Sequence, residues 1–360
     1  MRFIIADTYY DEFLADFYQA RPEAAALPYD EHCAELMSER FCTGDAYAAG
    51  LRACGCDATT LVINSKPLQE CWAREAGFTA ATSGGNWKPE IFIEQVRRMR
   101  PDVVYLQELS AADDHVIAQL KPHTRLVVGQ IACTLPRRRA FRAHDLIVSS
   151  LPPIVDYFRA QGKASERLAL GFDRSVIDAV DVSGARHGVS FVGGLSGVHR
   201  ERIALLEYLC ERTPMHVYGY GLDQLAEDSP VRDVHRGTAW GMKMYAVLAG
   251  SQIVLNCHGE VEVGAMHTTH WANNCRLFEA TGVGACLLTD QKQNLAEFFA
   301  PHEEVAVYSS PEECLERISE LRADPARRRQ VAEAGQRRTL SEHTYQQRMT
   351  ELFAMIEAYL

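Results

Sequence analysis

Short runs of apolar, largely β-branched residues alternate with helix-forming stretches along almost the whole chain, and this alternation constrains the fold most. Parallel strands need long crossover connections, which are usually helices. The pattern therefore predicts an α/β protein built from βα units with parallel sheets. No apolar run approaches the roughly 20 residues that span a bilayer, so any membrane contact is expected to be peripheral.

The N-terminal half supplies one βα series. Its strands are predicted at residues 3–6, 59–63, 103–106, 126–128 and 146–148. Its helices are predicted at residues 11–19, 31–40, 45–54, 89–100, 111–120 and 153–161. A further short strand is expected around residues 168–173, before a polar run at 178–187 that suits a linker.

A second βα series begins after this linker. Its strands are predicted at residues 189–192, 216–218, 253–255, 285–288 and 305–308, and its helices at 199–210, 242–249, 276–281, 294–299 and 311–321. Ser310 before Pro311, with Glu313 three residues on, forms a capping-box pattern. Asp324 before Pro325 repeats the helix-start signal.

Chain length and these two series predict two Rossmann-like domains. We expect an N-terminal domain over residues 1–178, a C-terminal domain over 187–342, and a terminal helix over 343–360 that crosses back to the N-terminal domain.

The composition excludes some partners and compartments. The chain has 360 residues, of which 37 are basic and 48 acidic, and the net charge of −11 argues against a nucleic acid as partner. The basic patches at residues 97–100, 137–139 and 327–329 are predicted to be solvated surfaces. Eleven scattered cysteines without a C-x-x-C pair predict reduced thiols in a cytoplasmic protein.

Residues 274–290 carry the most chemical information. They form a polar loop starting at Asn274, a short helix, a glycine-rich turn and an apolar strand. The helix start offers free N–H groups to a phosphate, and Arg276 adds positive charge. Glu279 is placed to accept hydrogen bonds from ribose hydroxyls, and the alternative is that it only interacts with the helix macrodipole. This arrangement predicts a binding site for a nucleoside diphosphate.

The same segment resembles the donor-binding segment of glycosyltransferases with the GT-B fold, especially bacterial enzymes similar to CgeB and, more distantly, retaining family 4. The resemblance covers about residues 187–348. Its downstream matches, in the same order as in the family, are residues 295–299, 304–308, 310–313, 324–327 and 343–345, followed by Arg348. The chain departs from family 4 at Trp271, where that family has a second acid eight residues before the helix glutamate.

The resemblance implies a glycosyltransferase with its active site in the cleft between the two domains. It would transfer a sugar from a nucleotide-sugar donor to a glycan, lipid-linked or small-molecule acceptor, as in polysaccharide biosynthesis. The resemblance also implies retention of anomeric configuration and no bound metal or other cofactor. Because Trp271 replaces the second acid, we expect a front-face reaction in which Arg276 stabilises the leaving phosphate.

Residues just after the strands are further candidates, since ligands of open α/β sheets bind at the carboxyl ends of strands. Gly193 and Gly194 follow the first strand of the second series and permit close approach of a diphosphate, and Arg200 lies at the next helix start. The spacing is not that of a dinucleotide fingerprint. A purely structural turn is the alternative.

Asn256 and His258 follow the strand at 253–255 and are predicted to line the donor pocket. The alternative is a zinc site, for which the available ligands are His258, Glu260 or Glu262, His267 and His270. Their spacing matches no named zinc motif, and the predicted site contains no metal.

The N-terminal domain is expected to bind the acceptor. Glu108 is the best candidate for a catalytic base or for a contact to the acceptor hydroxyl, with a surface acid as the alternative. The other residues that follow predicted strands or begin helices are Asp7, Thr8, Thr43, Gln107 and Gln130. Residues 84–87 predict either a flap or an ordinary loop.

Two other functions fit the same two-domain plan. One is a non-catalytic protein that binds a sugar nucleotide or polysaccharide, which the absence of an acid at position 271 favours. The other is a sugar-nucleotide epimerase, which would need more acid and base groups facing the donor.

Overall fold

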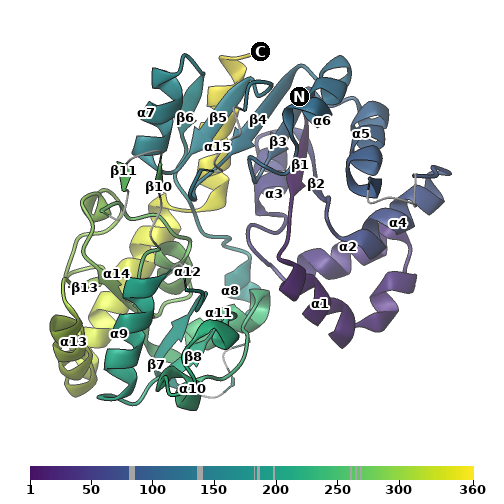
Figure 1. The fold of residues 1–360 in the computed structure, drawn as a ribbon. Helices are drawn as coiled ribbons and strands as arrows, with labels where there is room; N and C mark the ends of the chain where they lie inside the picture. The colour runs from purple at the N-terminus through teal and green to yellow at the C-terminus, as the bar shows by residue number, and fades with distance from the viewer. Residues whose placement is uncertain are drawn as a thin grey trace. The chain divides into compact units, whose positions relative to one another are not determined.

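A computed structural model describes residues 1–80, 86–135, 141–181, 183–184, 187–197, 199–259 and 270–360, together with the strand backbone of 262–263 and 266–267. It shows an α/β protein with two parallel sheets in two compact units (Figure 1). The first unit contains Met1–Ala169 and Gln346–Leu360, and the second contains Leu170–Tyr345. The unit boundary thus falls before the polar run predicted as a linker.

The N-terminal unit contains a six-stranded sheet in which every neighbouring pair is parallel. In spatial order, its strands are β2 (Asp57–Val62), β1 (Arg2–Asp7), β3 (Val103–Leu106), β4 (Leu126–Gln130), β5 (Leu146–Ser149) and β6 (Ser165–Arg167). The order runs to one side from β1 to β2 and to the other side from β1 to β3. The topological switch point therefore lies between β1 and β3, where ligands of such sheets gather.

The helices of this unit lie between its strands in the sequence, except α15, which comes from the C-terminal end of the chain. They are α1 (Asp11–Ala20), η1 (Pro22–Ala26), α2 (Tyr29–Ser38), α3 (Ala46–Ala53), α4 (Lys66–Glu75), α5 (Trp87–Met99), α6 (Asp114–Leu120), η2 (Lys121–His123), α7 (Pro152–Ala160) and α15 (Tyr345–Glu357). The end of α15 is tied to this unit, because Tyr359 donates a hydrogen bond to Glu166 (2.9 Å) and Arg125 donates one to the Leu360 carbonyl (3.1 Å).

The C-terminal unit contains a five-stranded parallel sheet. In spatial order, its strands are β13 (Ala306–Tyr308), β12 (Cys286–Asp290), β9 (Ser251–Asn256), β7 (His187–Val192) and β8 (His216–Tyr218). Its switch point lies between β7 and β9. Strands β10 (Glu262–Val263) and β11 (Met266–His267) form a separate antiparallel pair.

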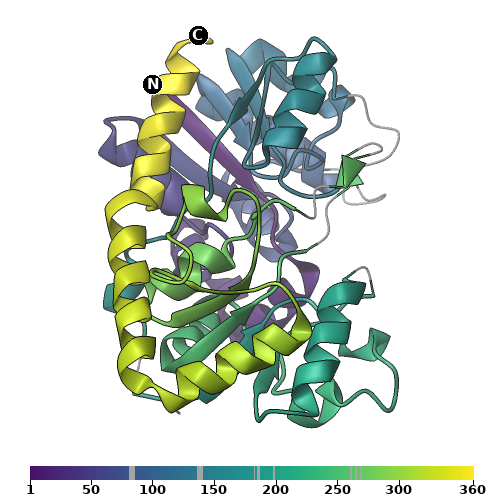
Figure 2. The same cartoon turned by 90° about the vertical axis from the view of Figure 1, so that its left-hand side faces the viewer.

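The helices of the C-terminal unit cover its sheet. They are α8 (Val176–Ala179), α9 (Arg200–Cys210), η3 (Leu222–Gln224), α10 (Val231–Val234), α11 (Gly241–Gly250), α12 (Arg276–Gly282), η4 (Leu295–Glu297), α13 (Pro311–Ala323) and α14 (Pro325–Glu342). Figure 2 shows α14 as a long helix along this unit. Helix α14 approaches its neighbours closely, since a Cβ on Gly335 would lie 2.4 Å from the Glu304 carbonyl oxygen.

The central strands are buried on both faces, which explains their continuous apolar sequences. All four residues of β3 are fully buried, as are Ile253, Val254 and Leu255 of β9. Burial of these side chains is the main stabilising contribution in each unit. None of the helices in the described ranges is long and apolar enough to cross a membrane.

The predicted start of α13 is confirmed in detail. The Ser310 side chain accepts a hydrogen bond from the Glu313 N–H (3.2 Å), and the Glu313 carboxylate accepts one from the Ser309 N–H (2.8 Å). Asp324 caps α14 in the same way, through the N–H groups of Ala326 and Arg327.

Other elements differ from the prediction. The helix predicted at 294–299 is only the 3-10 turn η4, and α4 was not predicted. The strand expected around 168–173 is reduced to a single bridge between Phe172 and Thr344, whereas β6 forms just before it. The predictions for Gly84 and Gly85, for residues 137–139, and for the side chains of residues 260, 262 and 267 concern positions outside the described residues.

Candidate functional site

The loops on either side of the C-terminal switch point are joined by one arginine. Arg202 of α9 donates a hydrogen bond to the Gly194 carbonyl after β7 (3.1 Å) and another to the Cys257 carbonyl after β9 (3.0 Å). Its guanidinium lies 5.8 Å from the centre of the Phe191 ring. The described residues provide no carboxylate partner for Arg202, and its Nε is buried without a hydrogen bond. A half-buried positive charge is therefore fixed at the edge where a ligand is expected.

The surroundings of Arg202 leave little room for other side chains. A Cβ on Gly259 would lie 3.1 Å from His199 Cε1 and 3.4 Å from the Arg202 guanidinium. Burial and the charge of Arg202 lower the pKa of His199 to about 4, so this imidazole is neutral at pH 7. Arg200, which the sequence suggested as the anion-binding residue, is an exposed first residue of α9. Arg202 lies at the switch point instead.

Gly194 and Gly219 lie where the turn after β7 and the turn after β8 pack closely together. A Cβ on Gly219 would lie 2.0 Å from the Gly193 carbonyl oxygen, and one on Gly194 would lie 3.0 Å from the Tyr220 hydroxyl. The Gly193 N–H donates to the Tyr218 carbonyl (3.0 Å). Since this N–H is already used within the protein, the part of this turn available to a ligand begins beyond Gly193.

Arg276 and Glu279 form a buried ion pair within α12. Arg276 Nη1 lies 2.7 Å from Glu279 Oε2, and Arg276 Nη2 donates to the Val192 carbonyl at the end of β7 (3.2 Å). Arg276 therefore links α12 to the switch point, while its Nε is buried without a partner. Burial raises the pKa of Glu279, and the charge of Arg276 opposes that rise. The structure thus places both predicted residues in one charged group.

Two asparagines connect the start of α12 to the sheet. Asn274 donates to the Asn256 side-chain oxygen (2.8 Å), and Asn256 donates to the Thr289 hydroxyl on β12 (2.9 Å). The backbone carbonyl of Asn256 accepts a hydrogen bond from the Tyr308 hydroxyl (2.9 Å). Asn256 is 2% exposed, so it orients Asn274 from inside the protein.

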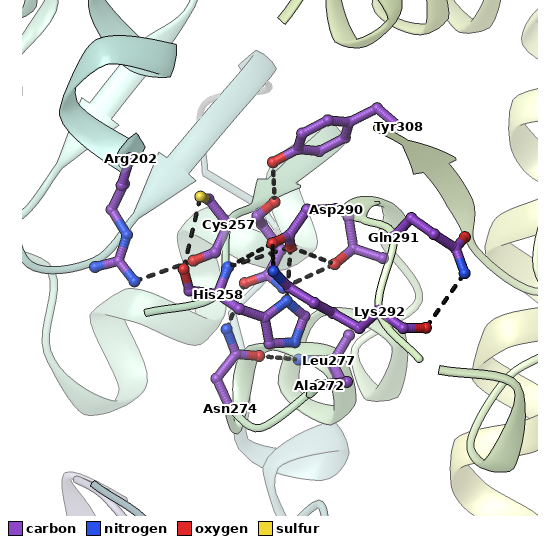
Figure 3. A network of polar contacts seen from close by, with 12 residues as sticks. Arg202, Cys257, His258, Ala272, Asn274, Leu277, Asp290, Gln291, Lys292 and Tyr308 are labelled. Atoms are coloured by element: carbon purple, nitrogen blue, oxygen red, sulfur yellow. Dashed lines mark hydrogen bonds and ion pairs between the residues drawn. The ribbon is translucent and has the colours of Figure 1, made fainter. Parts of the chain in front are cut away.

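His258 belongs to a second charged group, drawn in Figure 3. Its Nδ1 lies 2.6 Å from Asp290 Oδ1, and Lys292 Nζ lies 2.9 Å from Asp290 Oδ2. Burial acts to raise the pKa of Asp290, but the charges and hydrogen bonds of His258 and Lys292 hold it well below its usual range. The pairing fixes the ring, and His258 Nε2 is left buried without a partner among the described residues.

The alternative zinc site gains no support from the placed side chains. Within the described ranges, no group of three or more histidine, cysteine, aspartate or glutamate side chains is arranged to hold a metal. Asp290 occupies His258 Nδ1, and His270 is exposed.

Glu108 lies in the N-terminal unit, after β3. Its carboxylate accepts hydrogen bonds from the Ser110 N–H (3.0 Å) and the Ser110 hydroxyl (2.5 Å). At the same switch point, Asp7 accepts from the Thr8 N–H (2.8 Å) and the Thr43 hydroxyl (3.4 Å), and Thr43 accepts from Gln107 (3.1 Å). Burial raises the pKa of Asp7 to about 7, although both hydrogen bonds oppose it.

Sequence reasoning gave no role to Arg202, Asp290 or Lys292. A signal existed for Asp290, which closely follows the strand predicted at 285–288 and ends the observed β12 at the carboxyl edge of the sheet. Lys292 lies two residues further along the same loop. Arg202 gave no comparable signal, because a charge in the first turn of a helix is normally solvated.

The fold and the family comparison define the class of protein. Two parallel sheets in two Rossmann-like units match the solved GT-B glycosyltransferases, and residues 200–354 match the family described as glycosyl transferase-like. The C-terminal part of the chain is therefore similar to the glycosyl transferase-like family, and the solved structures show the two-domain fold. Comparison with curated proteins gave no match.

Three solved structures illustrate the likeness. Anabaena HepE in complex with UDP-glucose has a TM-score of 0.61 at 12% identity, over 99% of this chain and 100% of HepE. Sucrose-phosphate synthase from Thermosynechococcus elongatus has a TM-score of 0.58 at 11% identity, over 99% and 100%. AviGT4, a glycosyltransferase involved in avilamycin A biosynthesis, has a TM-score of 0.54 at 18% identity, over 87% and 86%. At these identities, the likeness establishes the fold.

Proposed function

We propose that the protein transfers a sugar from a nucleotide-sugar donor, and that the carboxyl edge of the C-terminal sheet binds the donor nucleotide. The observation that carries this proposal is the position of Arg202 and of the Arg276–Glu279 pair around the β7/β9 switch point. HepE, which has the same fold, was solved with UDP-glucose. We therefore take a uridine nucleotide as the first donor to test.

The two arginines and the glutamate suit different parts of a nucleotide. A diphosphate would act as the counterion of Arg202, for which the described residues provide no carboxylate. Arg276 would neutralise the negative charge that develops on the leaving phosphate. A carboxylate has about four acceptor sites, so Glu279 can accept a ribose hydroxyl while it keeps its bond to Arg276. His258, oriented by Asp290, would present Nε2 to a donor hydroxyl as a neighbouring hydrogen-bonding group. Asn274 and the turn at Gly194 would shape the rim.

The finer features of the reaction follow from the sequence resemblance. We propose retention of configuration through a front-face reaction, since Trp271 stands where a second acid would be needed. We also propose that no metal takes part, because arginines are available to neutralise the leaving group. The acceptor would be a glycan, lipid-linked or small-molecule hydroxyl compound, with Glu108 as a candidate contact. The eleven cysteines are all free, which fits a reducing cytoplasmic compartment.

A thermal-shift screen followed by a transfer assay tests the proposal. Nucleoside diphosphates and their sugar conjugates should raise the melting temperature, because a ligand at about 100 times its dissociation constant adds about 2.7 kcal/mol of apparent stability. Transfer to an acceptor, with activity that survives exhaustive chelation, would support the enzyme. Binding without transfer or hydrolysis would instead support a sugar-nucleotide-binding protein, and appearance of an epimer would support an epimerase.

A further inference from the structure

A small pocket lies in the N-terminal unit among the residues that follow β2 and β3 and the first turns of α5. Its volume is about 190 Å³, and its walls include Ile63, Phe92 and Val116. A cavity of about 150 Å³ can hold a ring the size of benzene, so this pocket would hold one ring-sized group rather than a whole disaccharide. Most of its lining residues are apolar. Lys88, Ser110 and Asp113 supply the polar part of the lining, so the pocket suits a group with an apolar face and a polar end.

One side chain of the pocket carries a positive charge. Lys88, in the first turn of α5, lines the pocket and is half-buried. Across the described ranges, it has no hydrogen bond or salt bridge to another side chain. Burial lowers the pKa of Lys88, whereas Glu108 and Asp11 act to raise it. Glu108 follows β3 directly and Asp11 begins α1, the helix that follows β1, so the ammonium lies near the β1/β3 switch point.

The polar neighbours of Lys88 are occupied. Ser110 donates its hydroxyl to Glu108, and the Asp113 carboxylate accepts the Val116 N–H at the start of α6 (2.8 Å). The pocket therefore combines a partly apolar lining with an ammonium group that forms no ion pair within the described ranges. Glu108 and Asp11 offset the burial of this ammonium only in part, and an anionic ligand in direct contact would offset more of it.

We propose that this pocket is an acceptor subsite, and that it binds an apolar group bearing a carboxylate or phosphate, with Lys88 contacting the anion. The proposal rests on the proposed function, because it assigns the acceptor of the same reaction. It gives the acceptor class as an amphipathic acid rather than a neutral oligosaccharide. Glu108 then lies beside the subsite, where an acceptor hydroxyl would approach it.

Binding of small probes to the full chain tests the proposal. Benzoate and phenyl phosphate supply the two anions, and benzyl alcohol is the neutral control. Methyl NMR should show saturable shifts at Ile63 and Val116, with an acid bound about tenfold or more tighter than the alcohol, as expected for a charge-assisted contact. The acid that binds more tightly, benzoate or phenyl phosphate, shows whether the subsite prefers a carboxylate or a phosphate.

Variants separate the charge from the pocket. Lys88→Met should remove the preference for acids, Lys88→Arg should retain it, and Val116→Phe should weaken all three probes by filling the pocket. Lys66→Met is the matched control, because Lys66 also begins a helix but is exposed and paired with Glu70. UDP binding should be unchanged in every variant.

Several outcomes would overturn the subsite. They are an absence of shifts at Ile63 and Val116, equal affinity for acids and alcohol, or an acid preference that survives in Lys88→Met. Failure of UDP to bind while the acids bind as expected would instead count against the donor site. The two proposals therefore fail separately.

Discussion

The carboxyl edges of the two sheets share a topology but differ in their chemistry. Around the N-terminal switch point, uncharged groups dominate: Tyr47 and Tyr105 both donate to Gln130, and Gln107 donates to Thr43. Around the C-terminal switch point, Arg276 pairs with Glu279, and Asp290 holds both His258 and Lys292. The same βα plan therefore supports either a weakly charged or a strongly charged edge.

This difference fits the proposed roles of the units, in which the C-terminal unit binds the donor and the N-terminal unit binds the acceptor. Charged side chains that are already oriented can bind a diphosphate without reorganising at the moment of reaction. An edge with neutral hydrogen bonds and a few isolated ionisable groups suits an acceptor that presents a hydroxyl. Each of the following substitutions changes the polar groups at one edge only. The backbone hydrogen-exchange rates of β9 and β12 report on the C-terminal unit, and those of β1 and β3 report on the N-terminal unit.

Asp290→Asn should produce the largest loss of stability. It removes the carboxylate that Lys292 and the His258 ring contact, and breaking a buried ion pair costs about 3 to 5 kcal/mol. Exchange should accelerate in β9 and β12 and stay unchanged in β1 and β3. The exposed Asp223→Asn is the control. Equal behaviour of the two variants would show that the Asp290 group does not stabilise the C-terminal edge.

Asp7 should make the N-terminal unit sensitive to pH. Its pKa is raised from 3.8 to about 7, so its stabilising contribution is complete below pH 3.8 and is lost as pH rises through about 7. Between pH 4 and pH 7 the loss amounts to about 3 kcal/mol. Asp7→Asn should flatten this dependence for β1 and β3. A wild-type protein whose β1 and β3 are equally protected at both pH values would contradict the raised pKa.

Arg276 and Glu279 should be energetically coupled by about 2 kcal/mol. Arg276→Met leaves a buried carboxylate and Glu279→Gln leaves a buried guanidinium, whereas the double variant leaves neither charge unpaired. Chemical denaturation of the four proteins completes the cycle. Additive losses would mean that the two side chains act independently despite their 2.7 Å contact.

Tyr105→Phe should have the smallest effect, about 1 kcal/mol, because it removes one neutral hydrogen bond and leaves its partner Gln130 bound to Tyr47. Exchange should change in the N-terminal unit alone. A loss as large as that of Asp290→Asn would remove the contrast between the two edges.

The sequence predicted the architecture well because parallel strands are buried on both faces. Strands β3 and β8 have the predicted bounds, since their apolar runs end where burial ends. Strand β6 lies at the edge of its sheet and has the polar sequence Ser165–Arg167, so apolar periodicity carried no signal for it. Helix α4 begins with Lys66 and Pro67 and is mostly polar, which resembles a loop.

The candidate site could be predicted only in part. Segment 274–290 and the end-of-strand rule brought Asn256, His258, Arg276 and Glu279 to one unit, where the structure joins them to the sheet edge. The sequence could not predict which of these residues form pairs. His258 and Asp290, for example, are 32 residues apart in the sequence and meet only when β9 and β12 pair in the sheet. The sequence could not show which arginine of α9 faces the sheet edge, because this depends on how the helix is rotated about its axis. The structure places Arg202, rather than Arg200, between two loop carbonyls.

The donor site is tested most directly by calorimetry of UDP and 2′-deoxy-UDP with the wild-type protein and Glu279→Gln. Charge-assisted hydrogen bonds contribute about 1.5 to 3 kcal/mol, so the variant should bind UDP about tenfold or more weakly. The penalty for removing the 2′-hydroxyl should be large in the wild-type protein and should shrink in the variant. An equal penalty in both proteins, or no UDP binding to the wild-type protein, would contradict the assignment of the C-terminal edge as the donor site.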